Sequence, residues 1–507
     1  MTSNFKALVF DLGGVLLNWD RSSVDVMTPN QFLTIMNSTT WHNLDRGLVT
    51  LKEACVEFGH LLGLDASTAE AALEQAQLSL TPNTSLIETI HDLRASNPSL
   101  KFYVMSNISR EHFEIVQRLN IPWSVFDKAF ASGVEGMRKP DLCFFEHVIK
   151  QTGVPADQIV MIDDTAENIC AARSKGMHGI LVDKALPNVN ITLRNMLQDP
   201  LPRAQAFLKN NAGSHHCTVE GHEEIQLKDN FAQLMIWELT DDEDIIYLKW
   251  PNGRMLGSQD THANGNTCTA SQVEDGLWNY FFEAPILTTR QFPPDADTTS
   301  TAYLSLPKRY LSTVPPVELI LDEMAANSDS DGIMQTYFDP KRPRVTPEVC
   351  CNILRVFHSF GHGSDPRIKR TEDYVVECLN NNACLNGNRH YSTPESFLYF
   401  VARLYAETNS LSLRKRLKAI KPQLQKRLDM PANPLALALR LFACQSMRVD
   451  PLLYQKDLER LLSLQEEDGG WPAGHFCCIG RTGARIGNRG LTTALVARIL
   501  QHEKANA

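Results

Sequence analysis

The sequence predicts a multidomain protein in which an α/β domain with a parallel sheet precedes an all-α domain. Three observations predict this fold class. The length of 507 residues is enough for two to four domains. Residues 1–185 alternate short apolar runs with helical patterns, as parallel α/β domains do. From residue 226 onward, helical patterns dominate.

Three short apolar runs near the N-terminus, each ended by polar residues, are typical of strands buried on both faces. They are Ala7–Phe10, Phe102–Met105 and Ile159–Ile162. Between and after them, amphipathic patterns predict helices over Glu111–Leu119 and Ala166–Lys175. Residues 20–95 look mostly helical and interrupt the alternation. We therefore expect a small helical cap over one end of the sheet.

A change in composition over residues 200–225 predicts a domain boundary. Pro200, Pro202 and the polar run 210–216 are typical of a linker. We therefore expect domains at 1–200 and 226–507, joined by a linker at 201–225.

Turns rich in Pro, Gly and Asn separate the helical patterns of the second domain. The predicted helices are Thr346–Phe360, Glu395–Tyr405, Leu435–Gln445, Leu453–Leu464 and Thr492–His502. No fixed repeat of about 33 or 34 residues is visible, which disfavours an ankyrin or tetratricopeptide solenoid. The pattern favours an irregular helical barrel or bundle.

Composition and charge exclude several classes of protein. Hydrophobic residues make up 43% and charged residues 21% of the chain, as in ordinary globular proteins. The net charge of −10 disfavours a general nucleic-acid binder. No apolar run reaches the length of about 18 residues that spans a membrane, and no secretory signal is visible. The 12 cysteines, as in Cys350-Cys351 and Cys477-Cys478, sit mostly in apolar patterns without zinc-like spacing. We expect reduced cysteines in a cytoplasmic protein; the oligomeric state stays open, a homo-oligomer included.

Polar residues follow each of the three predicted strands. Asp11 directly follows the first, Ser106 the second, and Asp163-Asp164 the third, while Lys139 lies in a loop. Because the carboxyl ends of parallel strands meet at one edge of a sheet, these side chains can converge on one site. Carboxylates hold a hard cation and lysine neutralises phosphate oxygens, so the set suits Mg²⁺-dependent phosphoryl transfer.

The order Asp, Ser, Lys, Asp-Asp resembles the four motifs of the haloacid dehalogenase-like phosphatases, which have a Rossmann-like sheet. The resemblance covers residues 1–185 and implies that Asp11 is the nucleophile. It also implies a phosphate-binding set, Ser106, Asn107 and Lys139; a Mg²⁺-binding set, Asp11, Asp164, Asp163 and the Gly13 carbonyl; and supporting or metal-binding residues, Glu167 and Asn168. The Asp163-Asp164-x-x-Glu167 segment also matches a class I terpene synthase pattern, but it ends a strand, which favours the phosphatase interpretation.

Position 13 departs from the phosphatase pattern. Family members usually carry a second aspartate two residues after the nucleophile, as general acid and base, whereas this chain has Gly13. General acid–base catalysis is typically worth about 10²–10⁴-fold in rate. Either the proton comes from substrate, water or another residue, or the site is inactive.

A second group of polar residues lies in the segment Gln291–Tyr303. Asp295 and Asp297 are spaced i, i+2 before a predicted helix, which Asp297 could simply cap. Aromatic residues are dense around and beyond the segment, and together they could line an apolar cavity whose π-faces suit a carbocation. They are Trp278, Tyr280, Phe281, Phe282, Phe292, Tyr303, Tyr310, Tyr337, Phe338, Tyr391, Phe397, Tyr399, Phe400 and Trp471. In such a cavity, desolvation raises the pKa of a carboxyl group and keeps it protonated.

Asp295-x-Asp297-Thr298-Thr299 resembles the DxDTT form of the acid motif of class II terpene cyclases. Gln465-x-x-x-Gly469-x-Trp471 resembles their QW motif, and the stretch 337–347 with Asn352 resembles the entry to one of their barrel helices. The resemblance implies an α/α barrel over 226–507. It implies that Asp297 protonates an isoprenoid, with Asp295, Thr298 and Thr299 tuning or orienting it. Candidates for holding the diphosphate are Lys249, Arg254, Arg290, Lys341, Arg342 and Arg344.

The two domains together resemble the haloacid dehalogenase-like sesquiterpene synthases of the drimane type. The resemblance implies protonation and cyclisation of farnesyl diphosphate to a bicyclic diphosphate. Dephosphorylation with Mg²⁺ would then give an alcohol, and overall resemblance favours albicanol over drimenol. Two alternatives stay open: a cyclase beside an inactive phosphatase-like domain, and a phosphatase with a helical protein-binding module.

Overall fold

The computed structural model describes residues 4–186, 188–256, 273–479 and 482–506. They form two compact units, Met1–Asp199 and Pro200–Ala507. The predicted linker 201–225 is instead structured and belongs to the second unit. It holds most of α11 (Pro200–Asn210), then β8 (Cys217–Val219) and the start of β9 (His222–Leu227). Leu201, Ala204 and Leu208 give α11 a buried face, which the neighbouring prolines and polar run masked in the sequence.

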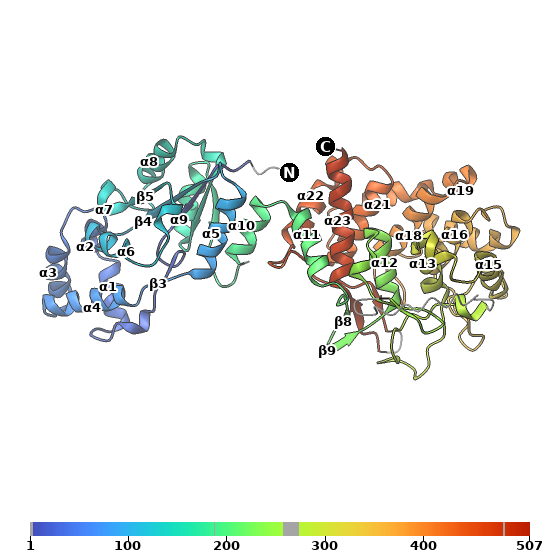
Figure 1. Cartoon of the computed structure of the whole chain (residues 1–507). Helices are drawn as coiled ribbons and strands as arrows, with labels where there is room; N and C mark the ends of the chain where they lie inside the picture. Colours follow the sequence, from blue (N-terminus) through green and yellow to red (C-terminus); the bar gives the residue numbers. More distant parts are fainter. Residues whose placement is uncertain (1–3, 187, 257–272, 480–481, 507) are drawn as a thin grey trace. The chain divides into compact units, whose positions relative to one another are not determined.

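A five-stranded parallel sheet forms the core of the first unit (Figure 1), in the order β5-β4-β1-β6-β7. The strands are β1 (Ala7–Phe10), β4 (Lys101–Ser106), β5 (Lys128–Ala131), β6 (Ile159–Asp163) and β7 (His178–Leu181). The three predicted strands are confirmed as β1, β4 and β6, and they are the three central strands. Their carboxyl ends therefore meet at one edge.

Helices cover both faces of this sheet. Leu8 and Phe10 of β1 face one apolar cluster, while Ala7 and Val9 face another. Helices α5 (Thr84–Ser96) and α10 (Val189–Leu197) contribute to the first cluster, and α8 (Leu142–Thr152) and α9 (Ala166–Ser174) to the second. Two short helices, α6 (Arg110–Val116) and α7 (Ser132–Glu135), follow β4 and β5.

A helical cap interrupts the chain after β1, as predicted, but it is shorter than the predicted 20–95. It consists of α1 (Pro29–Met36), α2 (Thr39–Asp45), α3 (Leu51–Leu62) and α4 (Ala66–Leu78), which share a core of their own. An antiparallel pair of short strands, β2 (Leu17–Asn18) and β3 (Thr81–Pro82), brackets it. Helix α5 belongs to the sheet instead, because Leu86, Ile90 and Leu93 pack on its face.

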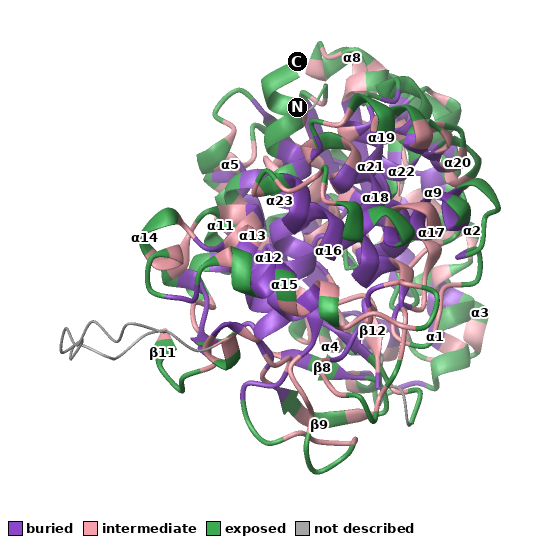
Figure 2. Ribbon diagram, turned by 90° about the vertical axis from the view of Figure 1, so that its right-hand side faces the viewer, coloured by how far each residue is buried: buried purple, intermediate pink, exposed green. Residues whose placement is uncertain are grey.

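Within the described part of the second unit, six helices form a closed ring in which each packs on the next and the last packs on the first. They are α12 (Asn230–Thr240), α13 (Ala296–Ser305), α16 (Pro347–Ser359), α18 (Pro394–Glu407), α21 (Pro434–Ser446) and α23 (Arg489–Asn506). Figure 2 shows α12, α16, α18 and α23 largely buried. The predicted α/α barrel is this ring.

Other elements surround the ring. Helices that pack on it are α11, α17 (Lys369–Asn380), α20 (Ile420–Arg427) and α22 (Pro451–Ser463), and further helices are α14 (Lys308–Leu311), α15 (Val317–Ala326) and α19 (Leu411–Arg416). The strands are β8, β9, β10 (Leu248–Lys249), β11 (Met255–Leu256), β12 (Cys477–Cys478) and β13 (Arg485–Gly487). Gln465 Nε2 donates to the Gly469 carbonyl, and Trp471 Nε1 donates to the Leu461 carbonyl at 2.7 Å. The QW-like segment thus fixes the turn that follows α22.

Two sequence expectations concern the whole chain. Over the described residues, no helix combines the length and the apolar character needed to cross a bilayer. The cysteines within those residues are free thiols, and most are buried, as expected. Cys477 and Cys478 are only half-buried, because they lie on the wall of a cavity described below.

Candidate active sites

The carboxyl edge of the first unit's sheet gathers the predicted polar residues. Asp11 lies just beyond β1, Ser106 ends β4, and Asp163 ends β6. Lys139 Nζ lies 2.9 Å from Asp11 Oδ1 and 2.5 Å from Asp163 Oδ2. All four side chains are buried. The edge therefore presents two carboxylates, a hydroxyl and an ammonium group to one small space.

The donor set at this edge fits a hard divalent cation. Asp11, Asp163 and Asp164 each offer an oxygen, and these oxygens lie within 4.8 Å of one another. Gly14 contributes by having no side chain: a Cβ there would lie 2.1 Å from Asp164 Oδ2, and its φ of +72° also favours glycine. Gly13, whose carbonyl oxygen the sequence resemblance implied as a further ligand, is exposed in the same turn.

The buried charges at the edge stabilise one another. Burial disfavours the Lys139 ammonium, but the carboxylates of Asp11 and Asp163 outweigh burial and raise the pKa of Lys139. Burial raises the pKa of Asp11, and Lys139 opposes that rise. Lys139 therefore stays charged and available to a phosphate group.

The other predicted residues of this site have supporting positions. Asn107, expected at the phosphate, accepts a hydrogen bond from the Lys139 backbone N–H at 2.7 Å and donates one to the Lys139 carbonyl at 2.8 Å. It holds the lysine loop. Asn168 donates to Asp163 Oδ1 at 2.9 Å, whereas the Glu167 side chain is exposed. Asn168 thus orients Asp163.

A cavity of about 190 Å³ lies next to this edge, between the cap and the residues that follow β4. Apolar cap residues dominate one wall, including Trp19, Phe32 and Trp41. Asn107, Ser109 and His112 form part of the opposite wall. Asp45 of α2 also faces the cavity; it is buried and pairs with Arg138 Nε at 3.3 Å. Sequence reasoning missed Asp45, since an aspartate at a helix end carries no distinctive signal.

The second unit holds a larger cavity, of about 480 Å³. Its lining comes mostly from segments that precede ring helices or start them, so the cavity lies at the amino-terminal end of the ring. Five predicted aromatics line it, with Phe231, which was not predicted: they are Tyr280, Phe281, Phe292, Tyr337 and Tyr391. The other predicted aromatics are not among the lining residues. Trp278, Tyr303, Tyr399 and Trp471, for example, are core residues.

The two aspartates of the DxDTT-like motif have different roles in the fold. Asp295, not Asp297, caps α13: its Oδ1 accepts from Thr298 N–H at 2.7 Å and its Oδ2 from the Thr298 hydroxyl at 3.0 Å. Asp297 lies in the first turn of α13, and its carboxyl group faces the cavity. Thr299 supports the backbone, accepting a hydrogen bond from Trp278 N–H at 2.9 Å.

Two donors hold the Asp297 carboxyl group. Asn352 Nδ2 donates to Asp297 Oδ1 at 2.7 Å, and the Tyr391 hydroxyl donates to Oδ2. Burial raises the pKa of Asp297 to about 6, while Tyr391, Asn352 and the charge of Arg355 oppose the rise. Burial and the neighbouring Asp297 raise the pKa of Asp295 to about 7. Asp297 is therefore a desolvated acid whose conjugate base is stabilised.

A buried ion cluster lies behind Asn352. Arg355 Nη1 donates to Asn352 Oδ1 at 2.9 Å, which turns the amide nitrogen of Asn352 toward Asp297. The Arg355 guanidinium also binds Glu238 at 2.6 Å and Glu407 at 2.8 Å. Arg403 binds the same two glutamates. The cluster links α12, α16 and α18 and fixes the direction of the Asn352 amide.

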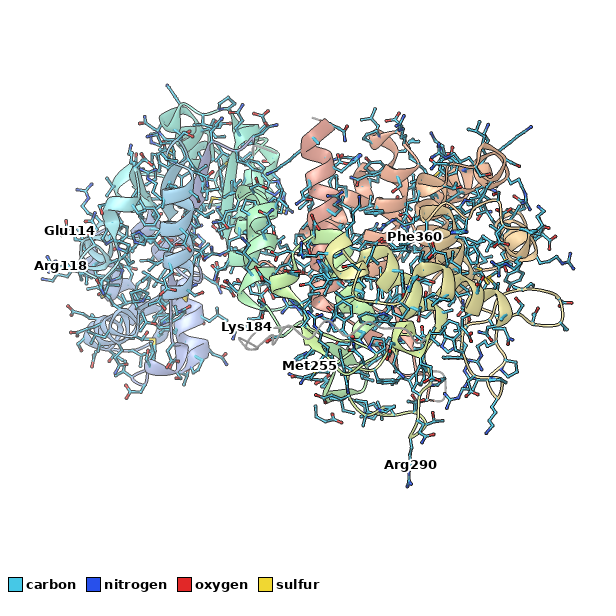
Figure 3. The ribbon with its side chains drawn as sticks, turned by 45° about the vertical axis from the view of Figure 1, so that its right-hand side comes forward. Glu114, Arg118, Lys184, Met255, Arg290 and Phe360 are labelled. Atoms are coloured by element: carbon cyan, nitrogen blue, oxygen red, sulfur yellow. The ribbon has the colours of Figure 1, made fainter. Side chains whose placement is uncertain are left out.

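Basic residues line one part of the cavity. Three of the six candidates lie there, Lys341, Arg342 and Arg344. Lys249, Arg254 and Arg290 are exposed and do not line it, and Figure 3 shows Arg290 pointing away from the unit.

An arginine and a histidine that sequence reasoning did not find also line the cavity; they lie in a loop without periodic pattern. The arginine is Arg389. The histidine is His390, whose Nε2 lies 2.8 Å from Arg344 Nη1. Burial and the neighbouring arginines lower the pKa of His390 to about 4, so it is a neutral acceptor for Arg344.

Comparison with known proteins finds a matching family in each unit. The family described as "haloacid dehalogenase-like hydrolase" matches residues 5–176, and the family "Sesquiterpene cyclase astC-like C-terminal domain" matches residues 201–360. "Drimenol cyclase drtB" of Aspergillus calidoustus is 33% identical over 497 residues, covering 98% of this chain and 88% of the relative. The chain belongs to the haloacid dehalogenase-like terpene cyclases. It is an enzyme that joins a terpene cyclase domain to a phosphatase-type hydrolase domain.

Two further similarities concern the first unit alone. "Sesquiterpene phosphatase astK" of Aspergillus oryzae is 34% identical over 186 residues, covering 37% of this chain and 94% of the relative. Among solved structures, the "had family enzyme bt-2542" of Bacteroides thetaiotaomicron is 22% identical, with a TM-score of 0.32, covering 37% of this chain and 98% of that one.

Proposed function

We propose that the chain is a bifunctional sesquiterpene synthase, which cyclises farnesyl diphosphate by protonation and then removes the phosphates. The observation that carries the proposal is the Asp297 carboxyl group, buried in an aromatic cavity that also presents basic side chains. An acid and an anion site in one apolar cavity suit a prenyl diphosphate, whose hydrocarbon tail reacts while its diphosphate is held.

In the proposed cyclisation, Asp297 transfers its proton to the terminal alkene of the substrate. Asn352 and Tyr391 donate hydrogen bonds to the carboxylate that remains, so they lower the cost of proton transfer. Tyr280, Phe281 and Phe292 surround the developing cation with aromatic faces. Loss of a proton from the bicyclic cation then gives the drimane-type diphosphate.

Lys341, Arg342, Arg344 and Arg389 would hold the diphosphate. They line the same cavity as Asp297, and their charges are opposite to that of the diphosphate. The amino termini of ring helices lie at this end of the barrel, and their dipoles also favour an anion. His390 accepts from Arg344 and so fixes the direction of that guanidinium.

In the proposed dephosphorylation, Asp11 attacks the phosphorus atom and forms an aspartyl phosphate. Lys139 and Ser106 bind the transferring phosphoryl group, and Asn107 keeps Lys139 in place. Asp11, Asp164, Asp163 and the Gly13 carbonyl would hold Mg²⁺, which when bound neutralises phosphoryl oxygens. The cavity beside this edge is lined by apolar side chains, which suit a terpenyl group.

Two alcohols are candidate products. Overall resemblance of the sequence favours albicanol, whereas the name of the relative that is 33% identical favours drimenol. Both are bicyclic, so the proposal of a drimane-type alcohol holds for either.

One alternative rests on a specific observation. Gly13 leaves the phosphatase site without the usual acid, which favours a cyclase that releases the bicyclic diphosphate. The protein-binding alternative loses support, because it needed the aromatics on an open surface. Tyr337, Phe281 and Tyr391 are instead buried around the cavity.

Purified protein with farnesyl diphosphate and Mg²⁺, followed by gas chromatography–mass spectrometry, tests the proposal. A bicyclic alcohol without added phosphatase supports both activities, and albicanol and drimenol standards identify it. A bicyclic alcohol that forms only after added alkaline phosphatase means that the cyclase works alone. Farnesol or unchanged substrate overturns the proposal for farnesyl diphosphate.

A further inference from the structure

The turn after β1 lacks the side chain that would protonate the leaving group in the proposed dephosphorylation. Breaking the bond between phosphorus and an alkyl oxygen leaves an alkoxide, which needs a proton. Gly13 has no side chain to supply it. The donor must therefore come from another element that faces the leaving group, which lies on the side of the phosphoryl site away from Asp11.

The cavity between the cap and β4 is where that leaving group would sit. Asn107, on the cavity wall, directly follows Ser106 and holds Lys139 on both sides of its backbone. The phosphoryl site and the cavity thus share a border at Asn107 and the lysine loop. A terpenyl phosphate with its phosphoryl group on Lys139 would extend its hydrocarbon among Trp19, Phe32 and Trp41.

Asp45 carries the one carboxyl group among the described residues that line this cavity. Its Oδ2 lies 3.3 Å from Nε of Arg138, the residue next to Lys139 in sequence. Lys139 Nζ in turn lies 2.9 Å from Asp11. Asp45 is therefore held on the cap side of the border between the cavity and the phosphoryl site.

The surroundings of Asp45 suit a group that gains and loses a proton. Burial raises the pKa of Asp45 to about 6, and Arg138, Arg46 and Lys139 oppose the rise. The acid form is thus accessible near neutral pH, and the pairing with Arg138 stabilises the carboxylate once its proton has left. Arg46 is itself paired with Asp141 at 2.6 Å.

We infer that Asp45, on the cap, is the general acid and base of the phosphatase site, in the place that Gly13 leaves empty. The inference rests on the proposed phosphatase activity. In the first step, Asp11 bonds to phosphorus, the bond from phosphorus to the alkyl oxygen breaks, and the Asp45 proton goes to that oxygen, giving the alcohol. In the second step, water attacks the aspartyl phosphate and gives its proton to Asp45. Phosphate leaves, and both aspartates are restored.

Two substrates with different leaving groups test the inference. Nitrophenolate leaves without a proton, whereas the alkoxide of farnesyl monophosphate does not. With Mg²⁺, Asp45→Asn should release a rapid burst of nitrophenolate, about one per active site, from p-nitrophenyl phosphate. Steady turnover should then be slow, because the second step lacks its base. Mass spectrometry of the intact protein should show a phosphoryl group accumulating on the chain.

With farnesyl monophosphate, Asp45→Asn should show no burst and a rate about 10²–10⁴-fold below that of the unsubstituted protein. Asp45→Glu, which keeps a carboxyl group, should recover part of the rate. Asp141→Asn is the matched control: it removes a carboxylate that pairs with Arg46 but does not line the cavity, so both substrates should react nearly as before.

Three outcomes would overturn the inference. Asp45→Asn could lose the burst with p-nitrophenyl phosphate as well, which would mean a structural role. It could keep the rate with farnesyl monophosphate. The selective loss could appear in His112→Gln instead, which would assign the proton to the histidine on the opposite wall. If the unsubstituted protein hydrolyses neither substrate, the proposed phosphatase function fails as well, and these two failures are distinguishable.

Discussion

At the scale of single residues, the structure separates two aspartates that look equivalent in the sequence. Both carboxylate oxygens of Asp295 accept hydrogen bonds from Thr298 at the start of α13, whereas the Asp297 carboxyl group faces the cavity. From the sequence, Asp297 had two possible roles, helix cap or proton donor, and Asp295 was expected to tune or orient the acid. The hydrogen bonds show that Asp295, and not Asp297, is the cap of α13.

The first residue-scale prediction concerns pH. Asp297 acts in its protonated form, and its pKa is about 6. Above pH 6 the protonated fraction falls about tenfold with each pH unit, so the cyclisation rate should fall with it. Formation of bicyclic product should be measured from pH 5 to 9, with added alkaline phosphatase so that the other domain does not limit detection. A rate that rises with pH over this range would contradict the role of Asp297.

The second prediction concerns Tyr391. Tyr391→Phe removes a hydrogen bond to the Asp297 carboxylate, worth about 1.5–3 kcal/mol, so the cyclisation rate should fall about 10- to 100-fold. The acid also becomes weaker, so the midpoint of the pH profile should move upward. The control is Tyr405→Phe in α18, the helix that Tyr391 precedes. Tyr405 does not line the cavity, so this variant should match the unsubstituted protein. Equal loss in both variants would point to damage of the fold.

At the scale of elements, the turn between β1 and β2 brings backbone and side chain unusually close. Gly14→Ala would place a Cβ against Asp164 Oδ2, at a φ that disfavours alanine. Asp164 must then move, so we expect weaker Mg²⁺ binding, measured by calorimetric titration of Mg²⁺. Cyclisation should be unchanged. Unaltered Mg²⁺ affinity would mean that Asp164 is not a ligand.

The ion cluster of Arg355 makes the other element-scale prediction. Arg355→Met leaves Glu238 and Glu407 with one fewer partner in the interior of the ring. Breaking a buried pair typically costs about 3–5 kcal/mol, so the free energy of unfolding should fall by about that amount, measured by urea denaturation. Replacing Arg309, whose pairing with Glu243 is exposed, should change it little.

The elements also show what could be predicted from sequence. The three strands were found within one residue at each end, because a parallel strand buried on both faces gives a continuous apolar run. Strands β5 and β7 were missed, since each is only four residues long and begins with a polar residue, Lys128 or His178. Helix α11 was mistaken for linker because its prolines and the polar turn after it dominated the local composition.

The candidate sites were predictable to different extents for a related reason. Asp11, Lys139 and Asp163 lie at strand ends or in a motif loop, where spacing is informative. Asp45 and Arg389 come from a helix end and an irregular loop, and nothing local marks them. They reach their sites only through the packing of the cap and the closure of the ring.

At the scale of the whole molecule, the two proposed reactions take place in different units. The bicyclic diphosphate is the product of one reaction and the substrate of the other. We therefore expect that it can pass through solution from one protein molecule to another. An Asp11→Asn variant should convert farnesyl diphosphate to the bicyclic diphosphate and stop. Adding an Asp297→Asn variant afterwards should release the bicyclic alcohol. Gas chromatography after each addition checks this, with alkaline phosphatase added to a portion of the first reaction so that the diphosphate is detected as its alcohol. If the second addition yields no alcohol, although that variant alone releases farnesol from farnesyl diphosphate, the phosphatase does not accept the free intermediate.

The closed ring of helices separates what stabilises the second unit from what shapes its cavity. The inner faces of the six helices build the core, while the cavity walls come largely from the loops that lead into them. A loop can therefore change length or composition without disturbing the packing that keeps the barrel closed. Natural selection, or a protein engineer, can thus change which cyclic product the enzyme makes by exchanging the loops that lead into the helices, while the helical scaffold stays the same.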